Sequence, residues 1–201
     1  TLDADRLTLQ GGTLQTTASF TLNTNRGITL STDGGTINTN TGTTLTYGGV
    51  ITGSTAFTKS GAGTLVLSGT NTYTGTTTIS TGTLEVDGTL AQTAITVASG
   101  ATYDVDSTDT VLSITGAGTI DLTNAALTAG DGNDLEFSGV FNGANTFTKV
   151  GSGTLTLSGN NSSASYSGKL VVDAGTISVA ADNNLGTAPG SAVADQITLS
   201  G

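Results

Sequence analysis

The sequence predicts an all-β fold: a right-handed parallel β-helix (β-solenoid) of about ten rungs, at about 20 residues per turn, in one continuous segment over residues 1–201. Three observations predict it. Apolar and polar residues alternate in runs of only three to five residues, the chain repeats itself internally, and aromatic residues make up 4% of it. Strands that each bury about two aliphatic side chains suit a narrow stacked coil better than the wide core of a sandwich.

A period of two marks the expected strands, because successive side chains of a strand point to opposite sides. The alternation appears in residues 7–9, 28–30, 64–68, 84–86, 95–97, 120–122, 154–158, 177–179 and 197–199, and Gly-rich or Asn/Asp-containing turns separate these runs. No helix is expected beyond one turn within residues 179–186. The inward ladder of the coil is predicted to contain Leu65, Leu67, Leu84, Val86, Leu155, Leu157, Ile177 and Val179.

Internal repeats organise the chain at two scales. Residues 48–69 align without a gap with residues 138–159, at an offset of 90, and the similarity extends the two repeats to 48–88 and 138–180. Residues 1–11 resemble residues 191–201. The second match indicates that the chain is one tile of a longer array.

The repeats carry a family resemblance. Residues 57–75 read FTKSGAGTLVLSGTNTYTG and residues 78–84 read TISTGTL. This pattern closely resembles the autotransporter-associated β-strand repeat, also called the passenger-associated transport repeat. Residues 147–179 form a second, more degenerate copy, in which Asn161 answers Asn71. The resemblance implies a parallel β-helix in a large secreted or cell-surface bacterial protein, such as an autotransporter passenger, and it implies no catalytic residues.

The composition excludes several functions. Five basic residues against fifteen acidic ones give a net charge of −10, which argues against binding to nucleic acid or to anionic membranes. No window reaches the roughly 18 apolar residues of a membrane-spanning helix, so no membrane insertion is expected. The chain contains no His or Cys, which excludes the common nucleophile–base pairs. Carboxylate pairs remain conceivable at Asp104 with Asp106 and at Asp131 with Asp134, but no sugar-binding groups accompany them.

Other candidate sites have simpler interpretations. Residues 130–134, Gly-Asp-Gly-Asn-Asp, offer oxygen ligands for Ca²⁺, but without a second copy one turn away a tight turn is favoured. Asp104 and Asp106 are expected on one outer face, in solvent, with Asp109 weighed beside them as a third acidic candidate. Lys59 and Lys149 are expected to be exposed charges that hinder pairing of sheet edges. The Thr residues show no fixed spacing, so an ice-binding lattice is not predicted. We therefore expect no catalytic residue, metal or cofactor.

These observations predict a structural stalk or fibre segment of an exported bacterial surface or extracellular protein. Its expected partners are neighbouring repeats or copies of itself, stacked end to end. The alternative is an adhesin that recognises a glycan, a host protein or a matrix ligand through its outer face. An adhesin should carry an aromatic platform or a long loop, and the only insertion is the Ser-rich segment 162–165.

Overall fold

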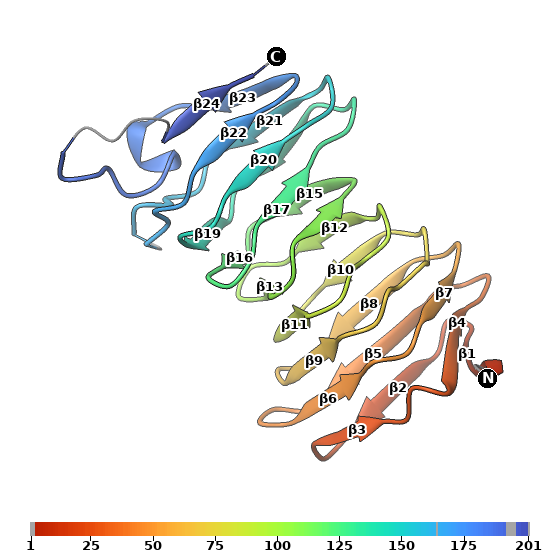
Figure 1. Ribbon diagram of the computed structural model, residues 1–201. Helices are drawn as coiled ribbons and strands as arrows, with labels where there is room; N and C mark the ends of the chain where they lie inside the picture. Colours follow the sequence, from red (N-terminus) through yellow and green to blue (C-terminus); the bar gives the residue numbers. More distant parts are fainter. Residues whose placement is uncertain (1–2, 164, 192–195, 201) are drawn as a thin grey trace.

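The computed structural model describes residues 3–163, 165–191 and 196–200. The chain winds into an elongated coil whose strands lie above one another from the N-terminal to the C-terminal end (Figure 1). Every strand pair is parallel, and each strand pairs with strands of the turns before and after it. The predicted parallel β-helix is therefore confirmed, with three strands to most turns, one on each of three faces.

The three faces are named here by their order within a turn. Face 1 contains two sheets, formed by β1 (Asp3–Leu9), β4 (Arg26–Leu30) and β7 (Ile51–Gly53), and by β14 (Asp109–Val111), β17 (Leu127–Ala129), β20 (Phe147–Lys149), β22 (Leu170–Val172) and β24 (Ile197–Leu199). Face 2 contains β2 (Thr13–Thr16), β5 (Gly35–Thr39), β8 (Phe57–Ser60), β10 (Thr77–Ile79), β12 (Ala94–Val97), β15 (Ser113–Gly116), β18 (Leu135–Phe137), β21 (Thr154–Leu157) and β23 (Thr176–Val179). Face 3 contains β3 (Phe20–Leu22), β6 (Thr44–Tyr47), β9 (Thr64–Leu67), β11 (Thr83–Val86), β13 (Thr102–Val105), β16 (Thr119–Leu122) and β19 (Val140–Gly143).

The turns vary in length while the strands stay aligned. Thr77 pairs with Ile95, 18 residues later, whereas Thr13 pairs with Thr36, 23 residues later. The corners absorb the difference. Nine strands on face 2 correspond to about nine turns, close to the ten expected. The one helical element among the described residues is a 3₁₀ turn over Asp182–Asn184, inside the segment where a single turn was expected.

The core is a set of columns that run along the coil axis. On face 3, residues paired from turn to turn stack Leu45, Leu65, Leu84, Tyr103, Ile120 and Phe141 in one inward column. All of these side chains are buried. Of the nine aromatic residues, all but Phe20 are buried. Phe141 contacts Phe137, Phe147 and Tyr166 at ring-centroid distances of 5.3, 4.8 and 5.5 Å. The few aromatic residues thus fill the interior of the coil rather than forming a platform on its surface.

Outward-facing Thr residues also align, although their spacing along the sequence varies. On face 2 the pairing places one Thr from each of six successive rungs in a row, formed by Thr13, Thr36, Thr58, Thr78, Thr96 and Thr115. Two hydroxyl oxygens of this row, those of Thr96 and Thr115, are 3.0 Å apart. The sequence spacing of the Thr residues is uneven, and the row still forms because unequal corners compensate for it. Cross-strand Thr pairs of this kind stabilise adjacent rungs.

The two repeats, residues 48–88 and 138–180, do not lie on the same faces. β8 and β9 of the first copy belong to faces 2 and 3, whereas the equivalent β20 and β21 belong to faces 1 and 2. The second copy is therefore rotated by one face, about a third of a turn. The match between residues 1–11 and 191–201, at an offset of 190, behaves differently. The strands within these two segments, β1 and β24, both lie on face 1.

Candidate functional site

The predicted ladder residues lie at inward positions of faces 2 and 3. Leu65, Leu67, Leu84, Val86, Leu155 and Leu157 are buried. Ile177 is partly buried and Val179 is 39% exposed. Both belong to β23, which is the last strand of face 2 in the described part of the chain. Val179 pairs with Leu157 in the same column, so its exposure reflects the lack of a covering rung there rather than an outward orientation.

Two lysines lie inside the coil, contrary to the expectation that they are exposed. Lys59 has no exposed surface and Lys149 is 2% exposed. In β8, Phe57 and Lys59 are buried while Thr58 between them is partly exposed, so the period of two assigns the lysine to the inside. Its paired neighbours in the same column are Ile37 and Ile79. The aliphatic stem of Lys59 thus takes the place of a core side chain.

The ammonium group of Lys59 is bound by backbone carbonyl oxygens at the corner between faces 2 and 3. Its Nζ donates to the carbonyl oxygens of Ser60 at 2.9 Å, Gly61 at 2.7 Å and Thr81 at 3.0 Å. The first two belong to its own rung and the third to the next rung. Burial lowers the pKa of Lys59 to about 8, so the amine is still mostly protonated at neutral pH. We call Lys59 with these three carbonyls the first corner site.

Lys149 forms the same arrangement in the second repeat. Its Nζ donates to the carbonyl oxygens of Val150 at 2.5 Å, Gly151 at 2.9 Å and Ala174 at 3.4 Å. Burial lowers the pKa of Lys149, and the nearby charge of Asp131 acts in the opposite direction. This second corner site lies between faces 1 and 2, one face away from the first. The interior chemistry of the repeat is thus retained although the repeat has rotated.

Glycines shape both corner sites. Gly61 and Gly82 have φ angles of +75° and +70°, in the left-handed region where a Cβ is disfavoured. A Cβ on Gly82 would also collide with the carbonyl oxygens of Gly61 and Gly63. Gly175 stands in the same relation to Gly151 and Gly153 in the second repeat. These glycines let successive corners approach closely enough for one ammonium group to contact two rungs.

Buried asparagines bind the backbone at other corners. Asn71 accepts a hydrogen bond from the Ile51 N–H at 3.0 Å and donates to the carbonyl oxygens of Gly69 and Thr89, both at 3.2 Å. Asn161, its counterpart, accepts from the Phe141 N–H at 2.6 Å and donates to the Asn184 carbonyl at 2.5 Å. Each side chain therefore links its own rung to both neighbouring rungs.

Asp109, the third acidic candidate weighed beside Asp104 and Asp106, is a further buried polar residue. It is 3% exposed, and its Oδ2 accepts hydrogen bonds from the Leu90 N–H at 3.1 Å and the Tyr103 hydroxyl at 3.0 Å. Its Oδ1 accepts from the Thr110 N–H at 2.9 Å. Burial raises the pKa of Asp109 and these donors lower it. The residue bridges two rungs much as the buried asparagines do.

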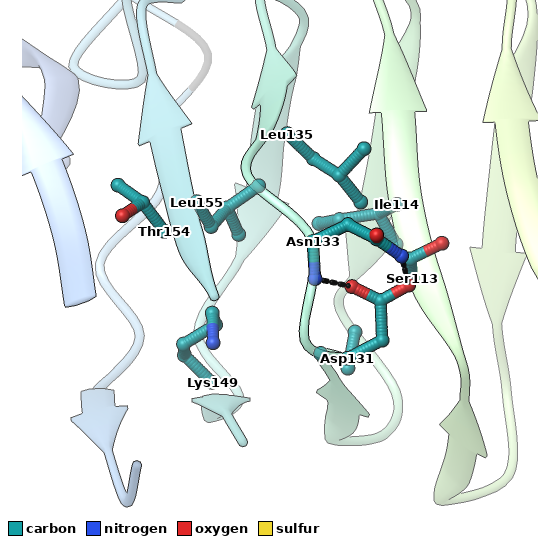
Figure 2. A pocket seen from close by; sticks show the side chains of 10 residues that line it. Ser113, Ile114, Asp131, Asn133, Leu135, Lys149, Thr154 and Leu155 are labelled. Atoms are coloured by element: carbon teal, nitrogen blue, oxygen red, sulfur yellow. Dashed lines mark hydrogen bonds between the residues drawn. The ribbon is translucent and has the colours of Figure 1, made fainter. Parts of the chain in front are cut away.

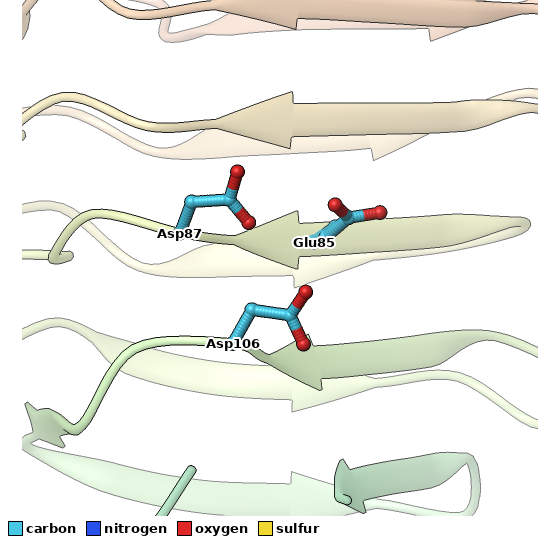
Figure 3. A group of neighbouring side chains, drawn as sticks. All are labelled: Glu85, Asp87 and Asp106. Atoms are coloured by element: carbon cyan, nitrogen blue, oxygen red, sulfur yellow. The ribbon is translucent and has the colours of Figure 1, made fainter. Parts of the chain in front are cut away.

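Asp104 and Asp106 do share an outer face, within an acidic group on face 3. The strand pairing places Glu85, Asp104 and Asp121 on successive rungs of one row. Beside this row, carboxylate oxygens of Glu85, Asp87 and Asp106 lie within 4.8 Å of one another (Figure 3). Burial, and then the charges of Asp106, Asp121 and Glu85, raise the pKa of Asp104 to about 7.

The carboxylates of Asp131 and Asp134 bind the backbone. Asp131 accepts from the Asn133 N–H at 2.8 Å and from its side-chain amide at 2.9 Å, and these side chains lie beside a pocket that Ser113 and Lys149 help to line (Figure 2). Asp134 accepts from the Thr154 N–H on the next rung at 2.7 Å. These contacts fit the tight-turn interpretation of the segment. Lys149 is the basic side chain near Asp131, and its ammonium group donates to the carbonyl oxygens of Val150 and Gly151.

Comparison with known proteins places these features in a family. A model of the passenger-associated transport repeat matches residues 57–86 and 147–179. The chain carries two passenger-associated transport repeats. Both corner sites, with Lys59 and Lys149, and both buried asparagines, Asn71 and Asn161, lie inside the matched ranges. The repeats therefore coincide with the segments in which interior polar groups link successive rungs.

One relative extends the comparison beyond the repeats. The adhesin BmaC autotransporter of Brucella suis biovar 1 (strain 1330) is 41% identical over an aligned length of 183 residues, and the match covers 85% of this chain and 5% of that protein. The repeats and this relative indicate an exported, cell-surface protein. No solved structure matches the chain. Within the described residues, no helix has the length and apolar character needed to cross a membrane.

Proposed function

We propose that this β-helical passenger segment is a structural stalk that has no enzymatic activity and holds other parts of an exported protein away from the cell surface. The observation that carries the proposal is what the two repeats share. Their inward lysines, asparagines and corner glycines recur, while the rotation by one face carries equivalent outward residues to different sides of the coil. A rod of stacked rungs needs repeated contacts between neighbouring rungs and no particular outer face.

Removing one repeat period tests the stalk directly. Deletion of residues 48–137 removes about four and two-thirds turns, which shortens the coil by about 22 Å at a rung spacing of about 4.8 Å. The shortened chain should fold, with the β-sheet circular dichroism of the parent and a reduced maximum dimension in small-angle X-ray scattering. A chain that unfolds, or that keeps the parent length, contradicts a modular rod.

We also propose that a further tile continues the coil beyond β24. Ile197 and Leu199 of β24 are 48% and 78% exposed, as is suitable for a strand that another rung can cover. β1, whose sequence resembles that of β24, lies on the same face, so each strand of a second tile would lie on the same face as its counterpart in the first tile. A chain in which residues 12–201 of a second copy follow Gly201, so that residues 191–201 take the place of its residues 1–11, should melt at a higher temperature than one tile. Equal melting temperatures would refute the continuation.

The name of the relative favours a second candidate, an adhesive outer surface. The acidic group on face 3 and the Thr row on face 2 are the most distinctive outward features of the described chain. Adhesion predicts that bacteria displaying this segment bind host cells or extracellular matrix better than bacteria displaying the stalk with face 3 neutralised. Equal binding leaves the structural role as the explanation.

A further inference from the structure

The two corner sites present an unusual energetic choice. At the column position of Lys59, the rungs on both sides use Ile37 and Ile79, so an aliphatic side chain fits the column. Burying an ammonium group there costs desolvation energy, and isolated buried charges are avoided in proteins. Hydrogen-bond acceptors at the corner must therefore offset the desolvation energy of the Lys59 ammonium group.

The backbone supplies those groups. Among the described residues, no backbone N–H donates to the carbonyl oxygens of Gly61 or Thr81, so the lysine ammonium is the donor that satisfies them. The same holds for the carbonyl oxygens of Gly151 and Ala174 at the second site. The left-handed glycines fix these oxygens in place whatever side chain precedes them. Gly61, Gly151 and Ala174 are partly exposed and Thr81 is exposed, so these oxygens lie at the edge of the interior, where a hydrogen bond from a charged donor is stronger than one from a neutral donor.

We propose that each corner site is a binding site for a primary ammonium group, built by the backbone of two rungs and filled from within by the lysine of the repeat. The lysine joins the corner of its own rung to the corner of the next rung. It therefore fixes the alignment of the two rungs at a point where no strand hydrogen bond can do so. The site belongs to the interior and does not depend on the stalk role.

Chemical rescue tests the ammonium site. Lys59→Ala removes three methylene groups and the ammonium, which together correspond to n-propylammonium. n-Propylammonium chloride should raise the melting temperature of the K59A chain by about 2–4 °C relative to tetramethylammonium chloride at equal ionic strength. n-Propanol, which has the same stem without the charge, should not produce this rise. The parent chain and K169A, which loses a lysine outside the corner sites, should show no such difference between the two salts.

A second variant separates the cation from the packing. Lys59→Met keeps most of the stem and removes the donor. K59M should exchange the amide protons of Ser80 and Thr83, which bond to the carbonyls of Lys59 and Gly63, about tenfold faster than the parent chain. If K59M is as stable and as protected as the parent chain, or if n-propylammonium has no specific effect on K59A, the ammonium site is refuted. If K59A is unfolded in buffer, the same salts are compared for their ability to fold it, and K149A repeats the test at the second site.

Discussion

The acidic row on face 3 makes the stability of the coil depend on pH in an unusual direction. Replacing Asp104 by Asn removes one negative charge from the middle of the row, between Glu85 and Asp121 on the neighbouring rungs. In the folded chain the pKa of Asp104 is raised from 3.8 to about 7. The folded state therefore holds a proton between about pH 4 and 7 that the unfolded state has lost. Stability from this group is highest at acidic pH and falls as the pH rises through 7.

The size of the effect follows from the two pKa values. A difference from 3.8 to about 7 corresponds to about 4 kcal/mol at full weight. Asp104 is only partly buried, so screening by solvent reduces this to about 1–2 kcal/mol. At pH 8.5 the D104N chain should therefore melt about 2–8 °C above the parent chain, and below the unfolded pKa of 3.8 the two should melt at nearly the same temperature.

The assay is thermal unfolding followed by circular dichroism from about pH 3 to pH 8.5, at low and at high salt. Asp33→Asn is the matched control, because Asp33 is exposed at a corner between faces 1 and 2 and carries the same charge. Salt should narrow the gap between D104N and the parent chain at pH 8.5. A D104N-to-parent difference that is the same at about pH 3 and at pH 8.5, or equal to that of D33N, would refute repulsion along the row.

Three further substitutions test the interior. Leu67→Ala, in a fully buried column, should lower the free energy of unfolding by about 2–5 kcal/mol in urea denaturation, and Leu67→Asp by more; unchanged midpoints would contradict the inward orientation. Asn71→Leu should cost about 1–3 kcal/mol because the Ile51 N–H loses its side-chain acceptor and the Gly69 and Thr89 carbonyl oxygens each lose one of two donors, and Asn25→Ala, at an exposed position, serves as the control. Gly82→Ala should lower the melting temperature through its left-handed φ and the collision with corner carbonyls, whereas Gly12→Ala meets no atom within 4 Å and should be neutral.

The strands and the inward columns could be predicted because they depend on a local rule. A period of two places Leu65 and Leu67 on one side of the chain regardless of the rest of the fold. The same rule, applied strictly, places Phe57 and Lys59 together on the inside. The general tendency of lysine to be exposed outweighed the alternation in the sequence interpretation. The sequence does not show which groups bind the buried ammonium. The three carbonyl oxygens belong to two successive corners, and these corners come close to each other only in the folded coil.

The outer faces were less predictable because they depend on turn length. Glu85 and Asp104 are 19 residues apart and Asp104 and Asp121 are 17 apart, yet the three are aligned. The Thr row on face 2 has the same origin. No sequence rule fixes how many residues each corner absorbs, so neither row can be read from spacing alone. The rotation of the repeats by one face was hidden for the same reason.

The rotation has a consequence for how such chains can lengthen. The repeated unit comprises a whole number of faces but not a whole number of turns, and yet both copies are accommodated in one coil. A duplicated or deleted gene segment therefore needs to begin and end only at equivalent corners of the two copies, which are 90 residues apart. Recombination between copies then changes the length of the protein by about four and two-thirds turns, and each such step turns the downstream exterior by one face, toward a new direction for antibodies or neighbouring cells.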